Sequence, residues 1–229
     1  MSHLTDYTVL EKKIGYIFKN QELLQRALTH SSYSNEFKST NREDYERLEF
    51  LGDAVLELSV SEYLFMHHPS MYEGNMTKLR ASLVCEPTLA ICAREIELEK
   101  YIMLGKGEEQ TGGRSRDSIV SDVFESLIAA IYLDSSYEEA KEFVCRRLLA
   151  DIENRILFCD SKSILQEMMQ QQGKDLIYEV VETSGPAHDR MYRVQAHING
   201  KKVGEGTGKS KKGAEQEAAY QVLITQKDK

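Results

Sequence analysis

The spacing of hydrophobic residues changes at about residue 160, and this change limits the folds open to the chain. Before it, apolar residues recur every three or four positions, which is typical of helices that bury one face. After it, apolar and polar residues alternate, which is typical of half-buried strands. The pattern therefore predicts an α+β protein of two domains: an all-α domain, residues 1–157, followed by a small mixed domain, residues 158–229.

The all-α domain contains five periodic segments, each predicted to be helical. They span residues 10–28, 45–63, 76–96, 119–133 and 137–156. Pro69, Pro87 and the segment 105–113 interrupt them, and we expect the last of these, which is rich in glycine, to be a flexible loop.

The second domain predicts the order α-β-β-β-α. Its helices are expected at residues 163–172 and 211–225, and its strands at 176–182, 192–198 and 201–206. Asn199-Gly200, between the last two strands, is a strong signal for a tight hairpin turn, because a type I′ turn needs a positive φ at both central residues.

Charge is divided unevenly between these two parts. The whole chain has a formal charge of −8, which by itself argues against a nucleic-acid partner. Residues 1–159 carry 18 basic and 27 acidic side chains, whereas residues 160–229 carry 11 and 10. Within residues 185–212 there are seven basic residues and two acidic ones. An acidic domain is thus joined to a small basic one, and only the latter suits phosphate binding.

Cysteine spacing and hydropathy restrict the compartment. Cys85, Cys92, Cys145 and Cys159 form no C-x-x-C pair, so neither a zinc site nor a redox motif is indicated. No apolar run reaches the roughly 18 residues that a membrane span needs, and the first residues do not resemble a signal peptide. We therefore expect a cytoplasmic protein with no membrane partner.

Carboxylates line one face of the helix predicted around residue 50. Glu46, Glu49, Asp53 and Glu57 fall within an arc of about 80° at 100° per residue. The opposite face carries Leu48, Leu51, Val55 and Leu58. Such a row is either a solvated acidic face or a set of metal ligands, and this helix alone does not distinguish the two.

Asp122 and Glu125 form a second acidic pair, inside the nearly continuous apolar segment 119–133. A buried carboxylate needs a partner, so either Lys or Arg side chains or a metal ion must neutralise this pair. The neighbouring row of acids favours Mg²⁺, a hard ion that prefers carboxylate and water oxygens. Acid clusters of this kind suit metal-assisted hydrolysis of phosphodiesters.

The basic segment offers an anion site. Gly208-Lys209-Ser210 looks like part of a phosphate-binding loop, but that motif needs glycine where this chain has Val203, so no nucleotide cofactor is expected. Lys211 and Lys212 stand at a predicted helix N-terminus, where backbone amides and positive side chains together attract phosphate. The alternative is an ordinary pair of solvated lysines.

Several segments resemble bacterial ribonuclease III, and the resemblance covers essentially the whole chain. These are Ala27-Leu-Thr-His-Ser-Ser-Tyr33, Glu46-Arg-Leu-Glu-Phe-Leu-Gly-Asp-Ala-Val-Leu56 and Ser121-Asp-Val-Phe-Glu-Ser-Leu-Ile-Ala-Ala-Ile-Tyr-Leu-Asp134. Residues 165–167 and 211–219 are similar to the first and last helices of a double-stranded RNA-binding domain. Ser126 departs from the family, which usually has alanine there.

The resemblance implies an endoribonuclease that hydrolyses double-stranded RNA with a divalent metal and leaves 5′-phosphate and 3′-hydroxyl ends. It implies Mg²⁺ as cofactor, with Mn²⁺ as a substitute, a homodimer, and a role in processing ribosomal, messenger and transfer RNA. Glu49, Asp53, Asp122 and Glu125 would bind metal, and Asp53 and Glu125 would be the most critical. Glu46 and Glu73 would support the site, Phe50 would enter the dimer interface, and His30 would be structural.

The same resemblance assigns an RNA-binding role to six residues of the second domain: Ser163, Gln166, His188, Lys209, Lys211 and Lys212. Recognition of A-form RNA depends on shape and on 2′-hydroxyl groups, because its major groove is too narrow to read. The alternative function is a catalytically silent double-stranded RNA-binding protein. It would be expected to have lost some of the four metal-binding acids, all of which are present here.

Overall fold

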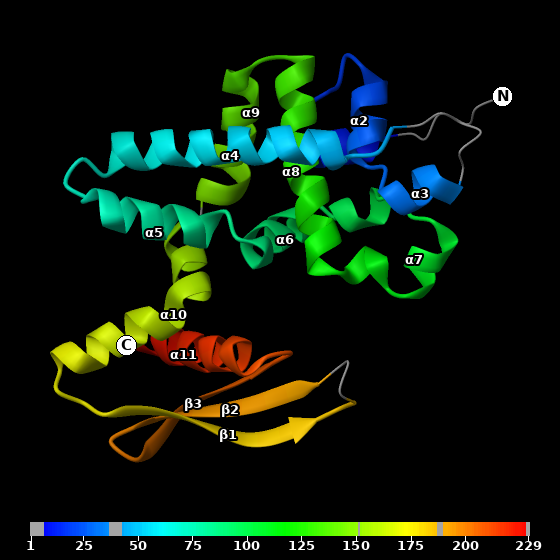
Figure 1. Cartoon of the computed structure of the whole chain (residues 1–229). Coiled ribbons are helices and arrows are strands. Elements are labelled where there is room, and N and C mark those ends of the chain that lie inside the picture. The colour runs from blue at the N-terminus through cyan, green and yellow to red at the C-terminus, as the bar shows by residue number, and fades with distance from the viewer. Residues whose placement is uncertain (1–6, 37–42, 151, 187–189, 228–229) are drawn as a thin grey trace. The chain divides into compact units, whose positions relative to one another are not determined.

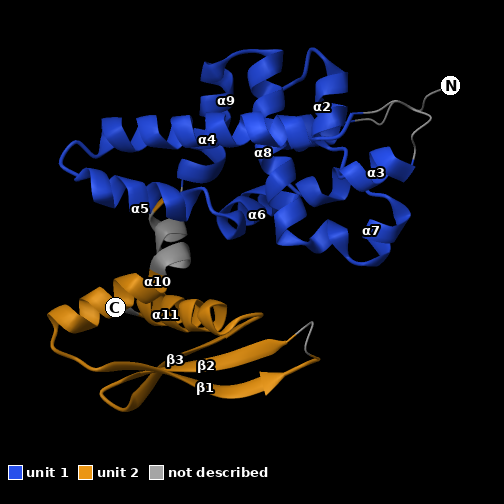
Figure 2. Ribbon diagram, viewed as in Figure 1, with its two compact units in different colours: residues 1–151 blue, residues 152–229 orange. Residues whose placement is uncertain are grey.

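The computed structural model describes residues 7–36, 43–150, 152–186 and 190–227. Contacts between residues divide the chain into two units, Met1–Asp151 and Ile152–Lys229 (Figure 2). The division falls at the start of a helix, six residues before the boundary predicted from the sequence. Among the described residues, no helix is long and apolar enough to cross a membrane.

The first unit is helical (Figure 1). Its α-helices are α1 (Thr8–Ile14), α2 (Gln21–Ala27), α3 (Ser31–Glu36), α4 (Glu46–His67), α5 (Glu73–Leu83), α6 (Glu86–Glu95), α7 (Lys106–Gln110), α8 (Asp117–Asp134) and α9 (Tyr137–Val144). Short 3-10 turns, η2 (Leu98–Tyr101) and η3 (Gly113–Ser115), and a π-helical turn, η4 (Cys145–Leu149), complete it.

The core of this unit is built around α8. This helix packs against α2, α4, α6 and α9, and eleven of its residues are buried. Its last residue, Asp134, accepts hydrogen bonds from the Tyr16 hydroxyl at 2.7 Å and from the backbone amides of Lys19 and Asn20, both at 2.8 Å. Helix α8 therefore joins segments that lie more than 100 positions apart in the chain.

Ser126 gives α8 a further buried contact. Its hydroxyl is fully buried and lies 2.7 Å from the backbone oxygen of Ala27 and 2.8 Å from that of Val123. Ala27 ends α2, so its carbonyl has no partner within that helix. The Ser126 hydroxyl can therefore donate a hydrogen bond to the end of α2, which an alanine at this position could not.

Several predicted helices are divided in the structure. The segment 10–28 breaks at Gly15, whose φ of 76° ends α1 in the left-handed conformation. The segment 76–96 breaks at residues 84–85, and α6 then begins with Pro87 in its first turn, where the missing amide costs no hydrogen bond. The prediction of a flexible loop at residues 105–113 was wrong, since α7 and the start of η3 occupy it.

The second unit follows the predicted order. It consists of α10 (Ile152–Gln171), β1 (Leu176–Ser184), β2 (Met191–Ile198), β3 (Lys201–Gly208) and α11 (Lys211–Lys227). The strands form an antiparallel sheet in the order β1-β2-β3. Asn199 and Gly200 both have positive φ, 49° and 76°, so the predicted hairpin turn is confirmed.

One face of this sheet is covered by helix, and glycine allows the close approach. A Cβ atom added to Gly206 would lie 2.3 Å from the backbone nitrogen of Ala218 in α11, which no side chain could tolerate. Leu165 and Met169 of α10 join Ala196 of β2 and Val222 of α11 in the core between these elements.

Candidate functional site

Helices α4 and α8 touch at Gly52. A Cβ atom added there would lie 1.9 Å from the backbone oxygen of Glu125 and 2.5 Å from its carbonyl carbon. The two helices are therefore in backbone contact, closer than any pair with side chains at the crossing could be. Figure 1 shows α4 crossing α8.

Three carboxylates meet there. Oxygens of Glu49 from α4 and of Asp122 and Glu125 from α8 all lie within 4.8 Å of one another, and all three residues are partly buried. Glu49 is three residues before Gly52, and Asp122 is three residues before Glu125, so helical periodicity puts each acid on the face toward the other helix. We call this group the acid cluster.

Burial and mutual repulsion both act on the acid cluster. Loss of hydration, followed by the charges of Asp53, Asp122 and Glu49, raises the pKa of Glu125 to about 8. Burial and the nearby charge of Asp122 also raise the pKa of Glu49. Among the described residues, burial and neighbouring carboxylates govern the pKa of both groups, with no Lys or Arg to offset them, so a cation among these oxygens would remove the repulsion. The donor set therefore fits a hard divalent metal ion.

The remaining predicted acids are placed differently. Asp53 is exposed and lies outside the group of three, although its charge is the second cause of the raised pKa of Glu125. Glu46 is exposed in the first turn of α4. Glu73 begins α5, where its carboxylate accepts a hydrogen bond of 2.9 Å from the Thr77 hydroxyl. Within the described residues, the structure does not bring Glu73 into the acid cluster.

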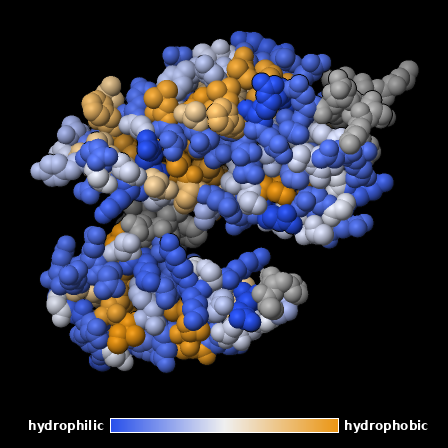
Figure 3. Space-filling view, viewed as in Figure 1, coloured by the Kyte–Doolittle hydropathy of each residue, from blue (hydrophilic) through white to orange (hydrophobic). Residues whose placement is uncertain are grey.

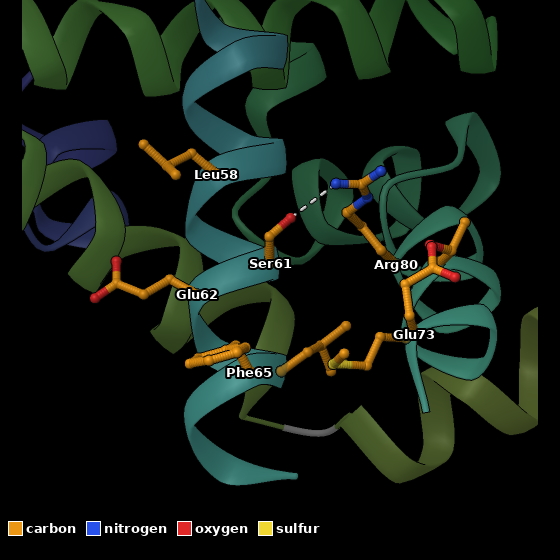
Figure 4. Close-up of a pocket in the computed structure, with 9 residues that line it drawn as sticks. Leu58, Ser61, Glu62, Phe65, Glu73 and Arg80 are labelled. Carbon is orange, nitrogen blue, oxygen red and sulfur yellow. Dashed lines mark hydrogen bonds between the residues drawn. The ribbon is translucent and has the colours of Figure 1, made fainter. Parts of the chain in front are cut away.

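A pocket of about 490 Å³ lies between α4 and α5. Its lining includes Leu58 and Phe65 from α4 and Glu73 and Arg80 from α5 (Figure 4). Arg80 donates a hydrogen bond of 2.9 Å to the Ser61 hydroxyl across it. Glu73 is thus part of this pocket rather than of the acid cluster in one copy of the chain.

Helix α4 exposes an unusual number of large apolar side chains. Phe50 is 83% exposed, Phe65 66%, Met66 65% and Leu58 56%. Leu58 was predicted to be on the buried face with Leu48 and Val55, and that prediction was wrong. Figure 3 shows orange, apolar atoms gathered over the region of α4 and α5. Apolar surface gathered in this way is typical of a protein interface.

Sequence reasoning missed the role of Tyr45, which directly precedes α4. Its side chain is buried, and its hydroxyl lies 3.4 Å from Asp122 Oδ2. In the sequence, only the place of Tyr45 next to Glu46 pointed to the site. Its contact with Asp122 joins residues 77 positions apart, which no local pattern shows. His30, predicted to be structural, packs near Tyr45 with ring centroids 5.7 Å apart.

Five of the six predicted RNA-binding residues lie within the described part of the second unit, and all five are exposed. Ser163 and Gln166 project from α10, Lys209 follows β3, and Lys211 and Lys212 begin α11. The turn before α11 is held by Ser210, whose hydroxyl accepts the amide of Gly213 at 3.0 Å. His188 lies outside the described residues.

Comparisons with known proteins agree on both units. The family model for ribonuclease-III-like domains matches residues 20–152, and the model for the double-stranded RNA-binding motif matches residues 161–225. Ribonuclease 3 of Listeria innocua is 47% identical over 219 residues, which are 94% of this chain and 96% of the relative. Ribonuclease 3 of Geobacillus sp. is 48% identical over 217 residues, 93% of this chain and 88% of the relative.

A solved structure also matches. The nuclease domain of ribonuclease III from Campylobacter jejuni is 40% identical, with a TM-score of 0.60, and the match covers 64% of this chain and 98% of that domain. In that protein, a region of the domain takes part in dimer formation.

Proposed function

This chain belongs to the ribonuclease III family, and on that premise we propose that its acid cluster binds Mg²⁺ for the cleavage of double-stranded RNA. The chain is an endoribonuclease of the ribonuclease III type. The observation that carries the metal proposal is the meeting of Glu49, Asp122 and Glu125 oxygens within 4.8 Å. The catalytically silent alternative has no support, since the acids that it would be expected to lose are present.

Each acid has a proposed role. Glu49, Asp122 and Glu125 would hold the ion directly, and Asp53 would join them from its exposed position beside Glu125. When bound, the ion supplies Lewis-acid stabilisation of the phosphate and activation of water. The backbone contact at Gly52 fixes the positions of the side chains that would hold the ion. These side chains are partly buried, which limits competition from bulk water. Glu46, whose charge acts on Glu49, would line the site in a supporting role.

Mg²⁺ is the proposed ion, with Mn²⁺ as a substitute, because a set of carboxylates without His or Cys suits small hard cations. The test is cleavage of an end-labelled RNA duplex by the full chain. We expect cuts at low millimolar Mg²⁺ or Mn²⁺, none with excess chelator, and products that carry 5′-phosphate and 3′-hydroxyl ends. Cleavage that persists in excess chelator would exclude the metal role. A single-stranded RNA of the same sequence is the control for the duplex substrate.

We also propose that the chain acts as a homodimer through the exposed apolar face of α4. Support comes from the 83% exposure of Phe50 and from the exposure of Leu58 and Phe65 on the same helix. Glu73 is outside the acid cluster of its own chain, so it would support a site only at such an interface. The two sites of a dimer would then cut the two strands of one duplex.

Phe50→Ala should weaken this dimer. A buried aromatic side chain lost from the centre of an interface typically costs about 2 kcal/mol or more, which corresponds to roughly a thirtyfold rise in the dissociation constant. Sedimentation of wild type and variant across a range of protein concentrations would measure it. Val9→Ala, at a residue 55% exposed in α1, is the matched control and should leave assembly unchanged. Equal dissociation constants for wild type and Phe50→Ala would place the dimer elsewhere.

The second unit is proposed to hold the duplex. Ser163 and Gln166 on α10 would reach one minor groove and His188 the next, with Lys209, Lys211 and Lys212 on the phosphates between them. Amides at the start of α11 add to the attraction of the lysines for phosphate. We propose structured transcripts, including precursors of ribosomal, messenger and transfer RNA, as substrates, and the cytoplasm as the location.

A further inference from the structure

Tyr45 contacts both of the helices that carry the acid cluster. Its backbone oxygen accepts the amides of Leu48 at 2.7 Å and Glu49 at 2.9 Å, and so forms part of the first turn of α4. Its hydroxyl lies 3.4 Å from Asp122 Oδ2 on α8. One residue therefore holds the backbone of one proposed ligand and the side chain of another.

The phenol is fixed by its surroundings. Tyr45 is 3% exposed, and its amide donates to the backbone oxygen of Thr29 at 2.9 Å. The ring of His30 lies against it at an angle of 57°. His30 is itself held, since its Nδ1 accepts the amide of Ser32 at 3.1 Å and lies 2.7 Å from the Ser32 hydroxyl. The tyrosine ring therefore has little freedom to turn away from Asp122.

The hydroxyl must be the donor in this contact. The Tyr45 phenol carries a hydrogen to donate, whereas an ionised carboxylate such as that of Asp122 can only accept. A hydrogen bond to a carboxylate stabilises its charged form and restricts its rotation. Asp122 needs both effects if its carboxylate is to bind a cation together with Glu49 and Glu125.

We propose that Tyr45 is a positioning residue, whose hydroxyl holds the Asp122 carboxylate in the orientation that lets it bind metal together with Glu49 and Glu125. The proposal rests on the proposed metal site. Tyr45 itself touches neither metal nor RNA in this arrangement, and acts through Asp122. Partners of this kind typically change metal affinity by 10-fold to 100-fold when they are removed.

The test compares Tyr45→Phe with Tyr16→Phe in the full chain. Both changes remove one hydroxyl that donates to an aspartate, but Tyr16 donates to Asp134, outside the acid cluster. Mn²⁺ binding is followed by electron paramagnetic resonance without RNA, and the Mg²⁺ concentration that gives half-maximal cleavage is measured in parallel. We expect about tenfold weaker Mn²⁺ binding for Tyr45→Phe, near the lower end of that range because the hydrogen bond is long, and no change for Tyr16→Phe.

A purely structural role would give a different pattern. It would lower the melting temperature of Tyr45→Phe, as of Tyr16→Phe, and leave Mn²⁺ affinity at the wild-type value, which would overturn the proposal. A double-mutant cycle adds a second criterion: in an Asp122→Asn background, Tyr45→Phe should no longer affect Mn²⁺ binding. An undiminished effect in that background would also overturn it.

Failure of the metal site itself would look different again. Wild-type protein that binds no Mn²⁺ would remove the proposed metal site, and the role of Tyr45 with it. If wild type binds Mn²⁺ and Tyr45→Phe binds it equally well, only the proposed role of Tyr45 is overturned.

Discussion

Gly52→Ala is expected to reduce RNA cleavage by roughly 100-fold or more, because misplacing catalytic groups by about 1 Å has effects of that size. The added methyl group would meet the backbone of Glu125 at 1.9 Å, and backbone cannot move aside as a flexible side chain can. The helices must separate, which parts Glu49 from Asp122 and Glu125. Overpacking of this kind also lowers the free energy of unfolding by about 1–3 kcal/mol.

The control for this variant is Gly107→Ala. Gly107 lies in α7, where an added Cβ would have no atom within 4 Å, so the change should leave cleavage unaltered and stability equal or slightly higher. Single-turnover cleavage at saturating Mg²⁺, with melting curves for both variants, would measure the two effects. A folded Gly52→Ala protein with wild-type cleavage would show that the backbone contact does not position the acids.

Glu125→Gln is expected to reduce cleavage by roughly 100-fold to 1,000-fold and to leave duplex binding nearly unchanged. The substitution keeps the size of the side chain but removes a negative charge from the acid cluster, and losses of one electrostatic contact in a catalytic site are of this order. Duplex binding is proposed to depend mainly on the second unit, which the change does not touch. Cleavage rate and duplex affinity, measured on the same preparation, test both halves.

The melting temperature of Glu125→Gln shows whether the variant loses cleavage because it fails to fold. Without metal, the pKa of Glu125 is raised from 4.5 to about 8 in the folded chain, so ionisation of this group favours the unfolded state. Its contribution to stability is fully present below pH 4.5 and is lost as pH rises toward 8. Glu125→Gln has no such loss, so above neutral pH the metal-free variant should melt at a higher temperature than metal-free wild type. A lower melting temperature at pH 8 would contradict this description of the cluster.

Local patterns were sufficient to predict most elements of the fold. The Asn199-Gly200 pair and the strand patterns on either side of it specify the hairpin, because these signals act over a few residues. Helix ends were harder to predict. The break at Gly15 and the π-helical turn at residues 145–149 interrupt stretches whose hydrophobic period continues through them. Helical periodicity therefore indicates the buried face of most helices, although not at Leu58, and it does not indicate where the backbone turns.

The acid cluster was only partly predictable for a related reason. Spacing within one helix indicated that Asp122 and Glu125 share a face, and the second acidic row suggested a partner for them. The closeness of Glu49 depends on Gly52, whose importance appears only when α4 and α8 cross. The contact of Tyr45 was missed because its partner, Asp122, is distant in the chain. The exposure of Leu58 was missed because the surface that we propose covers it belongs to another copy, and no local pattern indicates such a partner.

The central place of α8 has a consequence for how the protein is made. Helices α2, α4 and α6 bury their apolar faces against a helix that spans residues 117–134, so they cannot complete a core until that helix has been synthesised. At typical translation rates the growing chain carries these faces exposed for on the order of ten seconds. The second unit builds its core from 78 contiguous residues, with sheet neighbours that follow one another in sequence. During synthesis, the apolar faces of the nuclease unit are therefore exposed for longer than those of the second unit.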